Sequence, residues 1–257
     1  MMLQFGAGDV FARAITDIYG NRLNVPTPVR IMGLQEFGLD IQTELKEFHG
    51  QGRFPIATAQ GKAKISGKIK GALINGLALN TMVFGQTMAT GTMKAIYADE
   101  SGFKIPSATA FTITPTVPNS GRFVDDLGVL SADGNAMVKV AGSPNAGQYA
   151  CSSSGVYTFA EADKGKTVFI SFAYAYAAKD AKQIPLTNVS MGENATFQLF
   201  YVGKYNGKRA MVELASVTSG KLGMFSTKND DFSVPELDFS ASADETGFNV
   251  GYIHLQE

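Results

Sequence analysis

Gln35-Glu36-Phe-Gly-Leu-Asp40-Ile-Gln-Thr-Glu44-Leu-Lys46 and Lys62-Ala-Lys64-Ile-Ser-Gly-Lys68-Ile-Lys70 are the two stretches that decide the fold class of this chain. In both, apolar and polar residues alternate, which predicts strands with one buried and one exposed face. The exposed face of the first strand would carry Glu36, Asp40, Gln42 and Glu44, and that of the second Lys62, Lys64, Lys68 and Lys70. If the strands pair antiparallel, each well-placed carboxylate–ammonium pair contributes roughly 0.2–1 kcal/mol.

Residues 47–59 connect these two strands and combine glycines with aromatic residues. We expect a mobile loop of about a dozen residues here. A long isolated hairpin is marginal in water and its edges invite pairing, so this region favours assembly with other copies over a catalytic pocket. The alternative is a loop that folds back on its own domain.

The rest of the chain also predicts strands and turns, with one helix. A first hairpin is expected from 10–16 and 22–25 around Tyr19-Gly-Asn21, and another from 196–204 and 208–217 around Tyr205-Asn-Gly207. The helix is expected at about 72–85, with Gly85 as its C-terminal cap. The predicted fold class is therefore mainly β, a sandwich or half-barrel with one flanking helix.

Composition agrees with a strand-rich chain that associates with itself. The 257 residues include 28 glycines, and only 18% are charged, below the usual quarter. A net charge of −1 gives no basic field that would attract nucleic acid. The residues at 1–9 lack the features of a signal peptide, and no apolar run reaches the roughly 18 residues of a membrane helix. We expect folding in a reducing cytoplasm and no membrane segment.

Signatures of catalysis and of metal or cofactor binding are weak. The single cysteine, Cys151, has no histidine nearby in the sequence, and His49 and His254 lie far apart along the chain. Gly165-Lys-Thr167 resembles the end of a phosphate loop but lacks its first glycine. The pairs Asp125-Asp126 and Asp230-Asp231 are read as turn residues rather than calcium ligands. We therefore expect no enzyme activity and no cofactor; an esterase or glycosidase is the least favoured class.

Several segments in order along nearly the whole chain resemble the major tail protein, or tail tube protein, of long-tailed bacteriophages. Each segment alone is weakly specific. They are Phe5-Gly-x-Gly8, Tyr19-Gly-Asn21 with Pro26 and Pro28, Gly50-Gln-Gly-x-Phe-Pro-Ile-Ala-x-Ala59, the lysine strand and the helix, Asp126-Leu-Gly-Val129, Gly147-Gln-Tyr149, the stretch at 155–163, and the acidic stretch at 228–244.

The resemblance implies a ring-forming β-sandwich, usually of six subunits, with rings stacked into a tube through which double-stranded DNA passes. It implies tape measure, tail terminator and baseplate proteins as partners, and a location in the virion tail after assembly in the host cytoplasm. Residues 1–105 and 181–257 would form the tube domain, with 106–180 as an inserted β subdomain or an extension of the sandwich. The loop would contact the adjacent ring through Phe48, Gly50, Gln51, Arg53, Phe54, Pro55 and Ile56.

A DNA conduit must avoid phosphate contacts, so the lumen is expected to be acidic or uncharged, with Glu36, Asp40, Gln42 and Glu44 as candidates. The lysine row either pairs with these carboxylates or lies at a subunit boundary. Three other readings stay open. One is a trimeric receptor- or carbohydrate-binding sandwich of a tail fibre or decoration protein. Another is the related type VI secretion tube, and the third is the least favoured class, the esterase or glycosidase. The sequence does not distinguish a contractile from a non-contractile tail.

Overall fold

The computed structural model describes residues 6–71, 75–225 and 229–256. Strands hold 55% of the residues and the sheets are almost entirely antiparallel, so the mainly β prediction is confirmed. The chain divides into two compact units, one of Met1–Met88 with Ile184–Glu257 and the other of Ala89–Gln183. Residues 89–105 and 181–183 belong to the second unit rather than the first, because β5 (Ala89–Ala98) pairs along β12 (Thr167–Gln183).

The first unit is built on one eight-stranded sheet that folds over itself. Strands run in the order β2-β1-β13-β14-β15-β4-β3, with β16 added beside β14. The strand bounds are β1 Asp9–Thr16, β2 Val29–Ile31, β3 Leu34–His49, β4 Pro55–Gly71, β13 Thr196–Tyr205, β14 Lys208–Gly223, β15 Glu236–Ser242 and β16 Gly251–Leu255.

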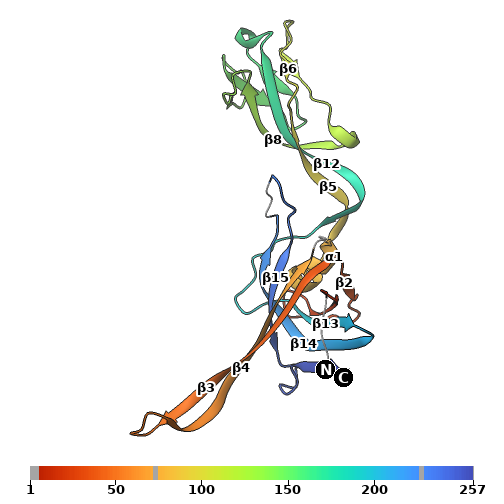
Figure 1. Cartoon of the computed structure of the whole chain (residues 1–257). Coiled ribbons are helices and arrows are strands. Elements are labelled where there is room, and N and C mark those ends of the chain that lie inside the picture. The colour runs from red at the N-terminus through yellow and green to blue at the C-terminus, as the bar shows by residue number, and fades with distance from the viewer. Residues whose placement is uncertain (1–5, 72–74, 226–228, 257) are drawn as a thin grey trace. The chain divides into compact units, whose positions relative to one another are not determined.

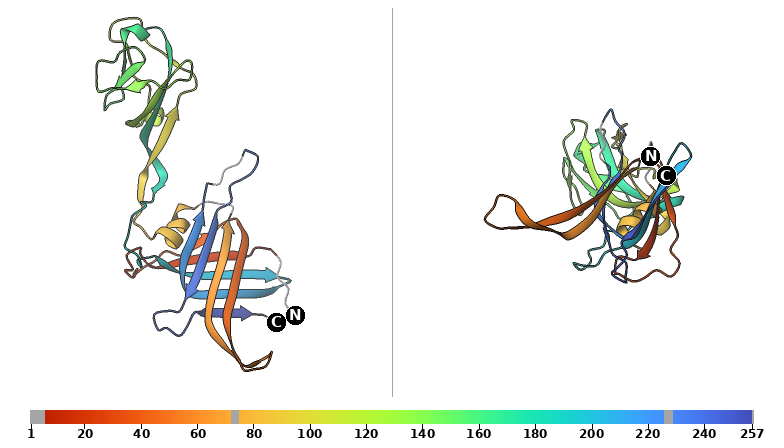
Figure 2. Two further views of the ribbon diagram at one scale, coloured as in Figure 1. Left: turned by 90° about the vertical axis from the view of Figure 1, so that its left-hand side faces the viewer. Right: turned by 60° about the horizontal axis from the view of Figure 1, so that its bottom comes forward.

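Strand β14 belongs to both halves of this sheet. Its residues 208–217 pair with β13 and its residues 210–214 with β16, whereas residues 216–223 pair with β15. The register slips between Ser219 and Lys221, as expected where a strand bends from one layer into another. Figure 2 shows the two groups of strands crossing. Side chains from both groups, including Val10, Phe197, Ile69 and Phe239, form one buried core between them.

The predicted helix is confirmed over residues 76–84, and the residues at 72–74 lie outside the described part. It begins as α1 (Gly76–Leu79), where the Asn75 side chain accepts hydrogen bonds from the Leu77 and Ala78 amides. It continues as a π turn, η1 (Asn80–Phe84), and ends at Gly85 with φ of 55°. Gly85 is the expected cap, because a side chain there would clash with Ala195.

One sequence expectation about the first strands is wrong. Strand β1 pairs with β2 and β13 and not with a strand at 22–25, of which Arg22 alone forms a bridge, to Thr16. The pairing stops after Leu23, whose amide donates to the Ile15 carbonyl, and it cannot resume at Pro26 and Pro28, which lack the amide that a ladder needs. The long acidic strand begins at Leu34, after a turn at Gly33. By contrast, the hairpin at Asn206-Gly207 is confirmed, with both residues at positive φ.

The second unit is a small sandwich with its own core. One sheet contains β5, β12, β6 (Phe103–Lys104) and β8 (Arg122–Ser131). The other contains β7 (Thr112–Ile113), β11 (Tyr157–Phe159), β10 (Gln148–Cys151) and β9 (Val138–Lys139). Tyr157, Ile170 and Phe172 lie fully buried between the sheets.

Candidate functional site

The candidate site is a hairpin arm that projects from the first unit. Strand β15 covers β4 only at residues 65–70, so residues 41–64 extend beyond the body of the sheet. Figure 1 shows β3 and β4 reaching out together past the other strands of their unit. We call residues 41–64 the arm. In the described part of the chain, arm residues 41–49 and 55–64 form ladder pairs only within the β3–β4 hairpin.

The arm is a paired hairpin almost to its tip, so the expectation of a mobile loop at 47–59 is wrong. Glu47 pairs with Thr58, Phe48 with Ala57 and His49 with Pro55. Only residues 50–54 lie outside the strands. Ladder pairing continues through register shifts at Thr43/Leu45 and Phe48/His49 into the stretch that glycines and aromatics made look irregular.

The tip presents its apolar side chains to solvent. Phe54 is 83% exposed, Phe48 67% and Ile56 70%, and the other predicted contact residues Gly50, Gln51 and Arg53 are exposed too, with Pro55 half-buried. The structure therefore does not show the alternative in which this segment folds back on its own domain. A row of exposed aromatic and aliphatic side chains on a two-stranded ribbon is typical of a surface that a partner covers.

The inner face of the arm continues the core row of the sheet. Phe37 packs on Tyr201 and Ile69 is buried in the core, while Ile41 and Leu45, further along the same row, are 56% and 65% exposed. The row therefore carries large apolar side chains from the core out into solvent. This is the surface that requires an explanation outside a single chain.

The outer face of the sheet carries charges whose sign alternates from strand to strand. In register order, Lys221 on β14 lies opposite Asp238 on β15, which lies opposite Lys68 on β4. One step along, Glu236 lies opposite Lys70, which pairs in turn with Glu36 on β3. Alternation of this kind places Lys221, Lys68 and Lys70 each beside an anion.

Two of the four predicted lysines are held in ion pairs. Lys70 Nζ lies 2.5 Å from Glu36 Oε2, as the sequence predicted. Lys68 Nζ lies 3.0 Å from Glu236 Oε1, a partner that the sequence analysis missed. The hydrogen bond between them lowers the pKa of Glu236 and raises that of Lys68. The signal that could have identified Glu236 is the alternation Glu236-Leu-Asp-Phe-Ser240, which predicts a strand with its acidic residues on one face.

The remaining charged residues of this face are not paired. Lys62, Lys64, Asp40 and Glu44 are exposed, and within the described residues none of them forms an ion pair. Asp40 lies opposite Ser66 and Gln42 opposite Lys64. The four predicted lumen residues do share one face of β3, but only Glu36 has its charge neutralised.

The part of the sheet that bears these charges has free edges on both sides. Among the described residues, β3 pairs only with β4, and residues 218–223 of β14 pair only with β15. A section of four strands, β14-β15-β4-β3, therefore ends in two unpaired edges. Exposed edges of this length are a template for pairing with another chain.

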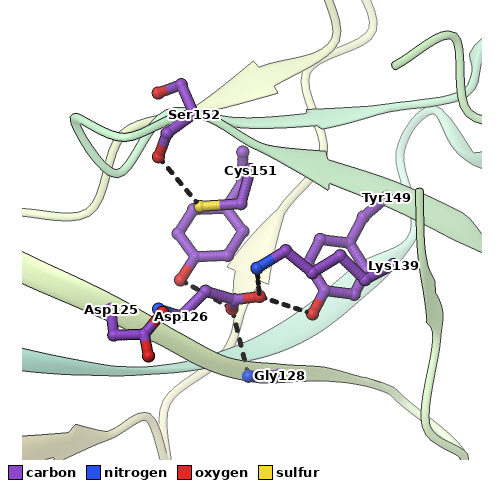
Figure 3. Close-up of polar contacts among 8 residues, drawn as sticks. Asp125, Asp126, Gly128, Lys139, Tyr149, Cys151 and Ser152 are labelled. Carbon is purple, nitrogen blue, oxygen red and sulfur yellow. Dashed lines mark hydrogen bonds and ion pairs between the residues drawn. The ribbon is translucent and has the colours of Figure 1, made fainter. Parts of the chain in front are cut away.

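The second unit contains a buried polar cluster around Asp126, which Figure 3 shows. Asp126 accepts hydrogen bonds from the Tyr149 hydroxyl at 2.8 Å, the Tyr157 hydroxyl at 3.0 Å and the Gly128 amide at 3.0 Å. The Lys139 ammonium lies 2.9 Å from the same carboxylate. These donors come from β8, β9, β10 and β11, so the cluster joins the two sheets of the sandwich.

The electrostatics of this cluster fit a structural role. Burial acts to raise the pKa of Asp126, but hydrogen bonds from Lys139, Tyr149, Gly128 and Tyr157 together lower it. Burial raises the pKa of Cys151, and the Asp126 charge raises it further. A reactive cysteine needs the opposite shift, so this thiol is a poor nucleophile. The hydrogen bond to Asp126 raises the pKa of the Lys139 ammonium although burial acts to lower it, so Lys139 keeps its proton.

The other motifs considered for binding have local structural partners. Lys166 of Gly165-Lys-Thr167 pairs with the buried Asp163, and a strand follows instead of the helix that a phosphate loop requires. Within the described part of the chain, no three His, Cys, Asp or Glu side chains are grouped as metal ligands would be. None of the helices described there is long and apolar enough to cross a membrane.

Comparison of the chain with protein-family models and with curated proteins found no match. The case for a function therefore depends on the arm, the charged face and the free edges.

Proposed function

We propose that this protein is a structural subunit that polymerises into stacked, hexameric rings and so forms the tail tube of a long-tailed bacteriophage. The observation that carries the proposal is the four-stranded section β14-β15-β4-β3, which has a free edge on each side and extends into an exposed arm. Closing such sections into a ring removes every edge, which is how β-barrels avoid uncontrolled pairing.

The charges support pairing of the β3 edge with the β14 edge of the next copy. The β3 edge is acidic through Glu36 and Asp40, and the β14 edge carries Lys221. Joining these edges would continue the alternation of sign around a ring. A head-to-tail contact of this kind is heterologous, and it gives a closed ring when the rotation between copies closes.

The same face suits a passage for DNA. Phosphate contacts act as brakes, and free lysines would provide them. The two lysines of the row that lie within the four-stranded section, Lys68 and Lys70, are neutralised by Glu236 and Glu36. Lys62 and Lys64, which form no ion pair within the described residues, lie on the arm instead. In this proposal the outer face of the section lines the lumen, and the subunit acts as a conduit without catalysis or cofactor. Tape measure, terminator and baseplate proteins would meet the tube, in the host cytoplasm during assembly and then in the virion tail.

The test is assembly of the purified full chain, followed by negative-stain microscopy and native mass spectrometry at rising concentration. We expect annular particles of six subunits and stacks of them. A stable trimer would instead favour the receptor- or carbohydrate-binding alternative. A monomer at every concentration would contradict both.

A matched variant isolates the role of the arm. Since Glu47 and Thr58 are paired, residues 48–57 can be replaced by Asn-Gly, which closes the hairpin with a two-residue turn. We expect a folded protein with the circular dichroism spectrum of the original chain and no tubes. Tubes of normal length from this variant would show that the tip has no part in assembly.

A further inference from the structure

A polar groove lies on the other half of the first unit, on the outer face of β1, β13, β14 and β16. Its volume is about 710 Å³. The residues that matter for its chemistry are Arg13, Arg22, Gln198, Glu213, Glu245 and Tyr252. The proposed pairing of the β3 and β14 edges in a ring does not involve this groove.

Glu213 is the unusual residue of this groove. It lies on β14 between Phe200 of β13 and Tyr252 of β16, so aromatic residues flank it on both sides. Its side chain is half-buried, and in the described part of the chain it forms no hydrogen bond or ion pair. A carboxylate that is partly desolvated without a partner is unfavourable, and a cation supplied from outside would relieve this.

The groove also holds a cation that no carboxylate neutralises. Arg13 donates from Nε and Nη2 to the neutral Gln198 Oε1. Arg22, by comparison, is paired with Glu245 at 2.8 Å. The groove therefore offers the carboxylate of Glu213, the cation Arg13 and the ring of Tyr252. Asp244, another acid of the lining without an ion pair in the described residues, differs from Glu213 because it accepts hydrogen bonds from the Thr246 amide and hydroxyl.

The tip of the arm carries complementary groups. Arg53 is exposed in the turn and has no ion pair among the described residues, and the exposed Glu47 carboxylate lies 3.1 Å from the His49 ring. Beside them stand the exposed rings of Phe48 and Phe54. The tip thus offers a free cation, an exposed carboxylate and apolar surface.

We propose that the groove is the receptor for the arm tip of a second copy, with Arg53 of the incoming arm paired with Glu213. This inference rests on the proposed function, since it names the surface through which copies of the chain join along a tube. The tip's own exposure indicates that it does not occupy the groove of its own chain. Glu47 would face Arg13, and the tip aromatics would cover Tyr252.

Charge reversal tests the pairing. Glu213→Arg and Arg53→Glu should each raise the protein concentration needed for tubes by at least about tenfold, because each places like charges together at the contact. Single rings should persist in both variants. The double variant Glu213→Arg/Arg53→Glu restores opposite charges and should recover tube formation. Glu193→Arg, an exposed change outside the groove, is the matched control and should assemble normally.

The outcomes separate this inference from the function on which it rests. Tubes in the original chain that also form normally in both single variants would overturn the groove while leaving the tube function intact. If both single variants lost tube formation and the double variant did not recover it, the Arg53–Glu213 pairing would also be overturned. Absence of rings and tubes in the original chain would overturn the proposed function, and the receptor with it.

Discussion

At the scale of single residues, Asp126 determines the stability of the second unit. Its side chain is 3% exposed and is the acceptor for two buried tyrosine hydroxyls. Asp126→Ala should destabilise this unit by about 1–3 kcal/mol for each hydroxyl left without an acceptor. Calorimetry should show one transition shifted and the other unchanged, because the first unit has a separate core.

Lys139→Met is the control for that change. The Lys139 side chain is 50% exposed, so solvent screens its pair with Asp126 and its loss should cost only about 0–1 kcal/mol. An equal effect of both variants would mean that the tyrosine hydrogen bonds contribute little.

The same carboxylate predicts an acid dependence. The pKa of Asp126 is lowered below its usual 3.8 in the folded protein, so folding is favoured by the ionised form. This contribution is fully present above pH 3.8 and is lost as the pH falls through the lower folded-state pKa. Acid titration of the second unit should therefore show a steeper loss of stability in the original chain than in Asp126→Ala. Parallel curves would contradict the assignment.

Asp40 tests the lining of the conduit. It is exposed on the outer face without an ion pair in the described residues. Because it lies on the edge proposed to face Lys221 of the next copy, Asp40→Lys should raise the protein concentration needed for rings. Tubes formed above that concentration should retain double-stranded DNA at low salt, with retention lost as salt rises. Asp40→Asn is the uncharged control. If tubes of the Asp40→Lys variant bound no DNA, the outer face would not line the lumen.

At the scale of elements, features that depend on neighbouring residues in the sequence were predicted correctly. The Asn206-Gly207 turn and the Gly85 cap need positive φ, and the sequence supplies residues that adopt it readily. The opposite-sign pairing of Lys70 with Glu36 followed from alternation on adjacent strands. These features depend on neighbours in sequence or on one simple pairing.

Features set by distant strands were not predictable in the same way. The lysine partner Glu236 lies on β15, more than a hundred residues further along the chain, and the bend in β14 that joins two layers has no short motif. The tip was mistaken for a loop because its glycines and aromatics hide the ladder between residues 47 and 58. Pairing with a distant strand decided the first two cases, whereas at the tip the local hairpin pairing overrode the loop-like composition.

Substitutions in the arm should impair assembly without lowering the stability of the monomer. Ile41→Thr with Leu45→Thr removes apolar surface that is more than half exposed, so unfolding of the monomer should change by less than about 0.5 kcal/mol for each. Assembly should nevertheless fail if a partner covers this row. Ile69→Ala, in the same row but buried, is the contrast: it should destabilise the fold by about 2–5 kcal/mol. Normal tubes from the threonine variant would contradict burial of the row.

At the scale of the whole molecule, the second unit has the character of an insertion. Its terminal residues, Ala89 and Gln183, pair with each other across β5 and β12. The chain therefore leaves and re-enters the first unit at neighbouring points, roughly 5 Å apart for paired strand residues. The two hydrophobic clusters have no residue in common.

This arrangement predicts that each unit folds without the other. Ala89–Gln183 expressed alone should unfold cooperatively, because it keeps its entire core and the Asp126 cluster. Joining Met88 to Ile184 through Gly-Gly should leave the ring-forming section and the arm unchanged, and the shortened chain should form tubes of normal length with a smaller subunit mass. Aggregation of the isolated insert, together with failure of the shortened chain to assemble, would show that the units depend on each other. The shortened chain and the arm variant that replaces residues 48–57 both lose residues, but only the arm variant loses the proposed contacts between copies. Tubes from the shortened chain and none from the arm variant would therefore locate the assembly function in the first unit.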